Sequence, residues 1–401
     1  MGLYWIRPWN FPTLDNKSRC YISEELCIQI KLNSPKGRCN ASDYLEILNT
    51  LEARFQEESS PVHSFPELSL TAEHSGTSAP PNATDPDVQD DEADATPKTD
   101  VICEPIKPYS VEDILSDGCF ITREKLEKIL KCLLTKKNLI LQGPPGTGKT
   151  WLAKRLAFAL MGQRDDRKVR AVQFHPNLSY EDFIRGWRPV GDGKLTLVDG
   201  PFVAMMNAAK NDPTSKYVLV IEEINRGNPT QIFGEMLTLL EADKRTSNEA
   251  LELSYKRSDN ERVYIPANLY VIGTMNIADR SIALVDLALR RRFAFIDLEP
   301  TFGEPWRKWV RSQCRIDSKI LDEIEKHLIA LNNDISADRA LGPQFQVGHS
   351  YVTPYGPIEE GNHREWFRQV VETEIGPLLD EYWFDALDKS QKARERLLEG
   401  F

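Results

Sequence analysis

The sequence predicts an α/β fold in which helices cover both faces of a mostly parallel sheet. Three observations favour this fold class. Five short apolar segments alternate with helix-forming stretches, a glycine-rich loop follows the first of these segments, and the pattern becomes helical after Pro300. Continuous apolar strands that alternate with helices are typical of parallel sheets covered on both faces. The helical end of the chain is predicted to form a separate C-terminal domain.

Composition divides the 401 residues into four parts. Residues 1–56 mix aromatic and apolar side chains, and this length is small for an independent domain, so the segment either packs on the rest or is a domain remnant. Residues 57–104 are rich in Ser, Pro, Thr, Ala and acidic residues, which indicates a disordered linker. We expect an α/β domain over residues 105–300 and a helical domain over residues 301–401.

The net charge of −11 is concentrated in the linker. The segment from Glu57 to Asp100 holds eleven carboxylates and one base, Lys98, so the rest of the chain carries about −1. Because a near-neutral body can present a local basic surface, the acidic total does not exclude DNA as a partner. No apolar run is long enough to predict a membrane span or a signal peptide. Seven scattered cysteines favour reduced thiols in a cytosolic protein.

The predicted elements follow in chain order. A helical pattern runs from Val111 to Leu134, where apolar residues recur three and four positions apart. Strands are predicted at 138–142, 169–174, 217–222, 268–274 and 292–298, with a hairpin turn at 191–193. Helical patterns then cover 306–313, 318–332 and 365–382.

The glycine-rich loop joins the first strand to the next helix and matches the G-x-x-x-x-G-K-[ST] pattern. It consists of Gly143, Pro144, Pro145, Gly146, Thr147, Gly148, Lys149 and Thr150. Glycines let consecutive N–H groups turn toward a phosphate, and the helix adds its positive N-terminal end. Lys149 is expected to reach the β- and γ-phosphates, and the Thr150 hydroxyl to complete a Mg²⁺ shell. A chance glycine turn is the alternative, but the flanking strand and helix favour binding of a nucleoside triphosphate.

Two carboxylates end the strand at 217–222. Acids at the C-terminal end of a strand beside a phosphate-binding loop suit the hydrolysis of a nucleoside triphosphate. Glu222 is expected to hold the Mg²⁺ shell through water, and Glu223 to polarise the attacking water. A solvated strand end is the alternative for an isolated acid pair.

A polar residue follows the fourth predicted strand, and a basic cluster precedes the fifth. Asn276 is delivered to the same edge of the sheet, where an amide orients the attacking water or touches the γ-phosphate; a turn-forming asparagine is the alternative. Three arginines, Arg290, Arg291 and Arg292, precede the last strand. They fit a solvated face, a nucleic-acid patch, or arginine fingers that reach a neighbouring subunit's site in ring-forming NTPases.

These motifs, in this order, resemble an AAA+ module of the McrB family. Residues 275–281 read Met-Asn-Ile-Ala-Asp-Arg-Ser, which is similar to the Met-Asn-Thr-Ala-Asp-Arg-Ser signature of that family. The stretches 223–226, 288–293 and 348–351 also resemble it, and the similarity extends over roughly residues 105–390. A generic AAA+ protein shares the phosphate-binding loop and lacks the signature.

The resemblance implies a GTPase that forms a ring, usually a hexamer, engages DNA and works with a separate endonuclease subunit, McrC. It implies a helical lid for the C-terminal domain. Carried over residue by residue, the resemblance implies that Gly143 through Thr150 bind the phosphates, that Glu222 serves the metal and that Glu223 is the catalytic acid. Asn276 and Asp279 would form the sensor region, and Arg291 and Arg292 would act in trans on a neighbouring subunit. Asn225 and Arg226 match family positions near the active site.

Two departures from the family pattern bear on these roles. Glu222 replaces the usual Asp and lengthens the arm that holds the metal by one methylene. Ile277 replaces Thr in the signature and removes a hydroxyl; where that hydroxyl selects guanine, its loss weakens the preference for GTP over ATP. Because McrB-type motors usually carry a larger N-terminal domain that reads modified cytosine, we also expect that DNA specificity lies in another polypeptide.

Two other functions compete with a DNA-directed GTPase. A MoxR-like AAA+ chaperone remodels proteins with ATP but normally lacks the signature at 275–281. A regulatory ring subunit binds nucleotide without turnover, and the intact Glu223, Asn276 and arginine cluster argue against it. Basic residues on predicted loops either face a ring pore or are solvated surface residues; these are Lys194, Lys244, Arg245, Lys256 and Arg257.

Overall fold

The computed structural model describes Leu51 and residues 107–190, 194–279 and 287–401. The chain divides into two units, Met1–Lys98 and Thr99–Phe401, and every described residue except Leu51 belongs to the second. The N-terminal segment 1–56, apart from Leu51, and the whole linker at 57–104 therefore lie outside the described residues. So do the hairpin turn at 191–193 and the last two residues of the signature, Arg280 and Ser281.

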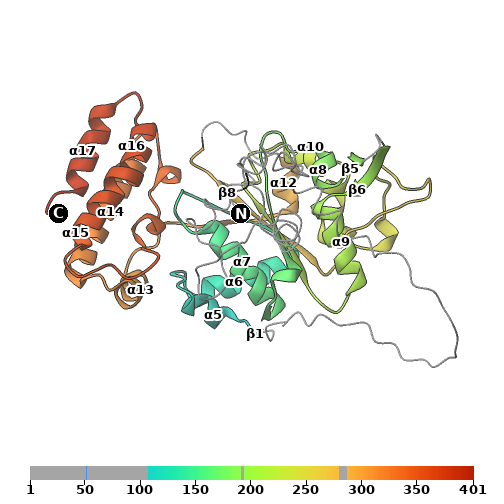
Figure 1. The fold of residues 1–401 in the computed structure, drawn as a ribbon, viewed down its shortest axis with the longest axis horizontal. Coiled ribbons are helices and arrows are strands. Elements are labelled where there is room, and N and C mark those ends of the chain that lie inside the picture. The colour runs from blue at the N-terminus through green and yellow to red at the C-terminus, as the bar shows by residue number, and fades with distance from the viewer. Residues whose placement is uncertain (1–50, 52–106, 191–193, 280–286) are drawn as a thin grey trace. The chain divides into compact units, whose positions relative to one another are not determined.

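Five parallel strands form the central sheet, as the sequence predicts (Figure 1). Their order across the sheet is β4-β7-β8-β2-β9. The strands are β2 (Asn138–Gly143), β4 (Val169–Gln173), β7 (Tyr217–Glu222), β8 (Leu269–Asn276) and β9 (Ala294–Asp297). In β2, β7 and β8 the apolar run is nearly unbroken because both faces of these strands are buried.

Alternate strand residues enter two separate hydrophobic cores. Leu139 and Leu141 of β2 pack with α5 (Val111–Ser116), α6 (Arg123–Lys136) and α7 (Lys149–Met161) on one face. Ile140 points to the other face and packs with a cluster of phenylalanines. That face is covered by α8 (Tyr180–Phe183), α9 (Pro201–Asn211), α10 (Pro229–Phe233), α11 (Met236–Leu239) and α12 (Leu287–Arg292).

The predicted helix at 111–134 is interrupted in the structure. Helix α5 ends at Ser116, and α6 begins at Arg123 with the Thr122 hydroxyl accepting a hydrogen bond from the Lys125 N–H at 3.4 Å. A side-chain cap of this kind marks the start of a new helix rather than the continuation of an old one. The apolar spacing that predicted one helix belongs to α6, and residues 117–121 form a connecting segment.

A hairpin and a set of loops extend the sheet's second face. Strands β5 (Arg185–Val190) and β6 (Lys194–Asp199) pair in antiparallel register, on either side of the predicted turn. Short strands β1 (Lys107–Pro108) and β3 (Gln163–Arg164) form a second antiparallel pair.

Among the loop cations, Arg245 is not a surface residue. Its side chain is only 3% exposed and donates hydrogen bonds to the carbonyls of Leu240 and Leu269 and to the Asn138 side chain. Burial lowers the pKa of Arg245 to about 9. A pore-facing or solvated role is therefore wrong for this residue, because the pattern of a polar loop does not reveal which cation turns inward to satisfy buried carbonyls.

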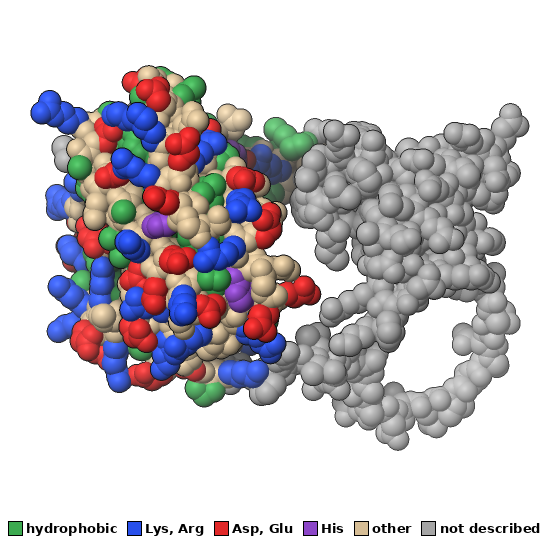
Figure 2. All heavy atoms as spheres, turned by 90° about the vertical axis from the view of Figure 1, so that its left-hand side faces the viewer, with side chains coloured by type: hydrophobic (Ala, Val, Ile, Leu, Met, Phe, Trp, Pro, Cys, Tyr) green, Lys and Arg blue, Asp and Glu red, His purple; other side chains and the backbone are tan. Residues whose placement is uncertain are grey.

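The C-terminal helices form a lid around their own core (orange to red in Figure 1). They are α13 (Glu304–Cys314), α14 (Ser318–Ala337), α15 (His363–Val370), α16 (Gly376–Tyr382) and α17 (Leu387–Leu397). Trp306, Phe367 and Trp383 lie in this core. Figure 2 shows basic and acidic side chains interspersed over one face of the lid. Within the described ranges, no helix combines the length and apolarity needed to cross a membrane.

Candidate nucleotide-binding site

The phosphate-binding loop has the backbone geometry that the sequence predicts. Gly146 and Gly148 adopt positive φ values of 76° and 73°, a conformation that glycine reaches without steric cost. Helix α7 begins at Lys149 directly after Gly148. The loop therefore ends on a helix N-terminus, where free backbone N–H groups and the helix dipole favour a phosphate.

Lys149 reaches back over this loop. Its Nζ donates hydrogen bonds to the carbonyls of Gly143 at 2.9 Å and Pro144 at 2.7 Å. Thr147 supports the same turn, because its hydroxyl donates to the Pro144 carbonyl at 3.0 Å. Burial lowers the pKa of Lys149 to about 8, and the nearby charge of Glu223 partly opposes this shift. The ammonium group and the Glu223 carboxylate thus belong to one site.

The register of the sheet brings the other predicted residues to the same edge. Asn276 lies directly opposite Gly143 across the β2–β8 pair, and β7 runs beside β8 and ends at Glu222. Beyond that end, the Glu223 N–H donates to the Thr274 hydroxyl at 3.3 Å. The carboxyl ends of three parallel strands therefore carry the loop, the amide and the two acids as neighbours.

Glu223 has a strained backbone and an unsatisfied carboxylate. Its φ of 52° lies in the left-handed region, which costs a non-glycine residue roughly 1–2 kcal/mol. Its Oε2 is buried and accepts no hydrogen bond within the described ranges, although Nε of Arg226 lies 3.5 Å away. A strained residue with an open acceptor is typical of a functional position, where the surrounding structure enforces the geometry.

Asn225, Asn276 and Asp279 form a polar group beside Glu223. The Asn225 amide donates to the Asn276 carbonyl at 3.2 Å, and the Asn276 Oδ1 accepts from the Ala278 N–H at 3.3 Å. Arg226 lies 3.8 Å from the Asp279 carboxylate. The Asn225 Oδ1 is buried and has no hydrogen-bond partner within the described part of the chain. The predicted sensor residues are thus held near Glu223, the predicted catalytic acid.

Oxygen atoms dominate the positions expected to hold a metal. The hydroxyl of Thr150 lies in the first turn of α7, and the carboxylate of Glu222 lies at the end of β7. Among the described residues, no group of three or more His, Cys, Asp or Glu side chains is arranged to hold a metal. Such a sparse oxygen set fits Mg²⁺, which is usually bound by one or two protein oxygens together with water and substrate phosphates.

The arginine cluster lies at the C-terminal end of α12. Arg291 is 77% exposed and Arg292 is 16% exposed, and a nitrogen of each lies 3.4 Å from the Glu241 carboxylate. Arg291 is therefore accessible to another molecule, whereas Arg292 is largely packed against its own subunit. Their action in trans stays a prediction.

A cavity of about 320 Å³ adjoins the phosphate-binding loop at Thr147 and Gly148. The residues that line it include Trp151, Trp309 and the connecting segment at 117–121, to which Phe120 belongs. An apolar, aromatic cavity beside a phosphate site suits a nucleoside. The helical pattern predicted for 111–134 runs through residues 117–121, so the sequence carries no signal that this segment lines a cavity.

The lid contacts the loop directly through residues 348–351, which we name the lid loop. The Gly348 N–H donates to the Pro145 carbonyl at 3.0 Å, and the Ser350 N–H donates to the Gly146 carbonyl at 2.9 Å. A Cβ atom on Gly348 would lie 2.0 Å from the carbonyl carbon of Gly146. The sequence singled out this stretch by resemblance alone and predicted no contact for it.

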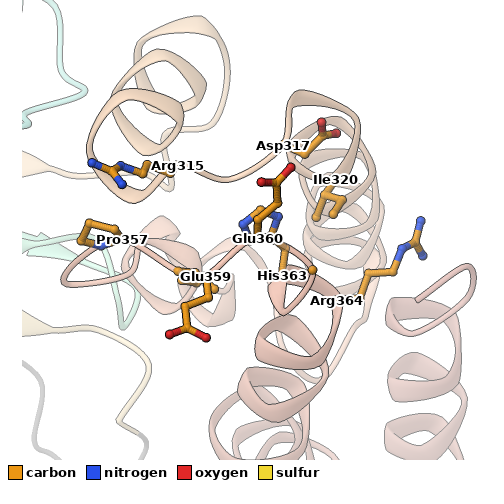
Figure 3. Close-up of a pocket in the computed structure, with 10 residues that line it drawn as sticks. Arg315, Asp317, Ile320, Pro357, Glu359, Glu360, His363 and Arg364 are labelled. Carbon is orange, nitrogen blue, oxygen red and sulfur yellow. The ribbon is translucent and has the colours of Figure 1, made fainter.

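A second cavity, of about 600 Å³, lies within the lid and contains none of the motif residues (Figure 3). Arg315, Asp317 and Glu360 are among its lining residues. Basic and acidic groups are mixed around it, so its charge does not select one class of ligand.

Comparison with known families supports the two described domains. A family model described as "AAA domain (dynein-related subfamily)" matches residues 138–293. A model described as "McrB, alpha-helical lid domain" matches residues 323–391. A third, a domain of unknown function (DUF8425), matches residues 1–75.

Two curated proteins illustrate the similarity of whole sequences. The type IV methyl-directed restriction enzyme EcoKMcrB subunit of Escherichia coli strain K12 is 45% identical over 293 residues, which are 72% of this chain and 63% of that protein. The chain thus spans less than two thirds of that relative. The type II restriction enzyme BsuMI component YdiS of Bacillus subtilis strain 168 is 27% identical over 254 residues, covering 52% of this chain and 72% of its own length.

Proposed function

This chain belongs to the McrB family, and from that membership we propose that it is a nucleoside-triphosphate-hydrolysing motor subunit of a restriction system. One observation supports hydrolysis above all others. Glu223, with its buried and unsatisfied carboxylate oxygen, lies at the same sheet edge as Lys149 and Asn276. A general base, a phosphate-binding cation and a polar amide are the groups that NTP hydrolysis requires.

In this proposal each group acts on a different part of the nucleotide. The loop N–H groups and Lys149 bind the phosphates, and Glu223 accepts a proton from the attacking water. Asn276 orients that water or the γ-phosphate. Thr150 and Glu222 hold Mg²⁺, which neutralises charge on the phosphate oxygens when it is bound. The strained backbone of Glu223 keeps its carboxylate at the strand end, where the water must lie.

GTP is the proposed substrate. The signature at 275–279 supports it through the resemblance, and the cavity beside Gly148 offers aromatic walls for a purine. Ile277, which replaces a threonine of the family pattern, is the residue that leaves ATP as the competing substrate.

The proposed partners are further copies of the chain, DNA and an endonuclease subunit. The exposed Arg291 supports a ring, most simply a hexamer, in which one subunit completes the site of the next. The E. coli relative is a subunit of a methyl-directed restriction enzyme. By analogy we propose a McrC-like nuclease that stimulates hydrolysis and acts on modified DNA.

Nucleotide turnover tests the proposal directly. GTP and ATP hydrolysis are measured with Mg²⁺, each with and without a McrC-type endonuclease subunit. Stimulated GTP hydrolysis supports the full proposal. A preference for ATP contradicts the GTPase assignment and favours a MoxR-like chaperone, while the absence of any turnover contradicts the role as a hydrolase and favours a regulatory subunit.

A further inference from the structure

His349 of the lid loop has a tautomer that its surroundings determine. The backbone N–H of Thr301 donates a hydrogen bond to His349 Nδ1 at 3.0 Å. Since Nδ1 accepts, the proton of the neutral ring is carried by Nε2. Burial lowers the pKa of His349 to about 4, so the ring is neutral at physiological pH and presents Nε2–H as a donor.

The ring is also held in one orientation. Phe120 packs edge-on against it with ring centroids 5.1 Å apart. The His349 carbonyl accepts a hydrogen bond from the Thr353 hydroxyl at 2.7 Å, and that hydroxyl accepts one from the Trp306 indole at 3.0 Å. The lid core therefore fixes the histidine backbone, Thr301 fixes Nδ1, and Phe120 of the α/β domain fixes the ring face.

Nε2 faces the phosphate-binding loop. It lies 4.0 Å from the position that a Cβ atom on Gly148 would take, and His349 lines the 320 Å³ cavity together with Thr147 and Gly148. In the described ranges, no residue accepts a hydrogen bond from Nε2. An oriented donor therefore points to the junction between the phosphate-binding loop and the aromatic cavity.

We propose that His349 is a nucleotide-binding residue whose Nε2–H donates a hydrogen bond to the nucleoside end of the bound nucleotide, at the α-phosphate, the ribose or the base. This inference rests on the proposed function. The contact does not involve the γ-phosphate, because Lys149 and Glu223 lie at the sheet edge where that group is transferred. His349 thus binds the diphosphate and the triphosphate equally, and through it the lid contacts the nucleotide directly.

Two substitutions separate the two ring nitrogens. His349→Asn places an amide oxygen where Nδ1 accepts from Thr301 and removes the donor at Nε2. His349→Gln extends an amide donor to the position of Nε2. We expect the dissociation constants of GDP and of a non-hydrolysable GTP analogue to rise by about tenfold in H349N, as for loss of one hydrogen bond, and to recover at least partly in H349Q.

Calorimetric titration of GDP, GTP analogue and the matching adenine nucleotides gives these constants, and thermal unfolding of the nucleotide-free protein provides the structural control. Unchanged affinity in H349N overturns the inference. So does an equal loss of affinity in both variants with a lowered unfolding temperature, since that pattern indicates a packing role. A wild-type chain that binds neither nucleotide refutes the proposed function itself, whereas wild-type binding with an unaffected H349N refutes this inference alone.

Discussion

Glu223, which we propose as the catalytic residue, has two features that cost stability. Its backbone lies in the left-handed region at φ 52°, and one carboxylate oxygen is buried without a hydrogen bond in the described part of the chain. Both features are unfavourable for the stability of the folded chain. The turn that enforces them is anchored to β8, because the Glu223 N–H donates to the Thr274 hydroxyl and the Asn225 amide donates to the Asn276 carbonyl.

Replacing Glu223 with Gln is expected to abolish turnover and preserve binding. Gln keeps the shape and the backbone strain but lacks a basic oxygen, so hydrolysis is expected to fall at least about 100-fold. Steady-state hydrolysis and nucleotide titration measure the two effects separately. Turnover at the wild-type rate in E223Q would show that another group activates the water.

Arg245 is predicted to contribute far more to stability than its sequence neighbour. Arg245→Met keeps much of the volume but leaves three buried acceptors without their donor, on Asn138, Leu240 and Leu269. We expect the free energy of unfolding to fall by about 3 kcal/mol or more. Lys244→Met removes the same charge one residue earlier, as the matched control, and is expected to change it by less than about 0.5 kcal/mol. Urea unfolding of both variants tests this difference, and equal effects would contradict it.

Because the pKa of His349 is lowered in the folded chain, we expect the free energy of unfolding to depend on pH. Its pKa falls from the ordinary 6.5 to about 4 in the folded chain because burial disfavours the charged ring. Between these values the unfolded chain binds a proton that the folded chain does not, so stability is complete above pH 6.5 and decreases toward pH 4. The full shift corresponds to about 3 kcal/mol.

Urea unfolding at several pH values in wild type and H349N measures this contribution. The difference between the two curves is expected to appear only below pH 6.5. A constant difference from pH 7 to pH 4 would show that the ring titrates normally.

At the scale of elements, the lid loop is the contact that joins the two domains at the nucleotide site. Gly348 and Ser350 donate to consecutive carbonyls of the phosphate-binding loop. Any movement of the phosphate-binding loop on nucleotide binding would therefore be transmitted to the lid directly, through these two backbone hydrogen bonds. This gives a physical route from the nucleotide to the C-terminal helices.

Gly348→Ala is expected to disrupt this contact. Its Cβ would lie 2.0 Å from a backbone carbon of Gly146, so the lid loop must move away and lose its hydrogen bonds. We expect the free energy of unfolding to fall by about 1–3 kcal/mol and nucleotide affinity to fall as well. Gly356→Ala, for which nothing lies within 4 Å, is the matched control and is expected to behave as wild type. Comparable behaviour of the two variants in unfolding and binding would refute the role of the contact.

At the scale of the whole molecule, the site is predicted to be shared between copies of the chain. Arg291 is exposed and lies in α12, directly before the edge strand β9. Glu223 follows β7, and strands β8 and β2 lie between β7 and β9 in the sheet, so Arg291 and Glu223 lie apart. An E223Q chain therefore keeps arginines that can serve a neighbour, and a chain with R291A and R292A keeps its own catalytic acid.

Mixing these two inactive variants is expected to restore hydrolysis. In a randomly mixed ring about one interface in four combines an intact acid with intact arginines, so about a quarter of wild-type turnover should return. Circular dichroism of each variant confirms folding, and sedimentation confirms mixed assembly. A mixture that assembles and stays inactive would show that the arginines do not act in trans.

Local patterns in the sequence predicted the five strands, the phosphate-binding loop and the residues at the strand ends, because apolar runs and glycine spacing depend on near neighbours along the chain. The same patterns placed Glu222, Glu223 and Asn276 at one edge, since parallel strands end together. The order of the strands and the gap between α5 and α6 came only from the structure.

By itself, then, the sequence determined the fold class, the resemblance to the McrB family and the meeting of Glu222, Glu223 and Asn276 at one sheet edge. Tertiary structure alone decided that Arg245 is buried, that the lid loop binds Pro145 and Gly146, and that His349 points its Nε2 at Gly148. Each of these contacts joins residues far apart in the sequence, and Arg245 reaches a carbonyl 24 residues away and an amide 107 residues away. Neither spacing nor composition encodes which distant partner satisfies a buried polar group, because that depends on how the packed elements meet.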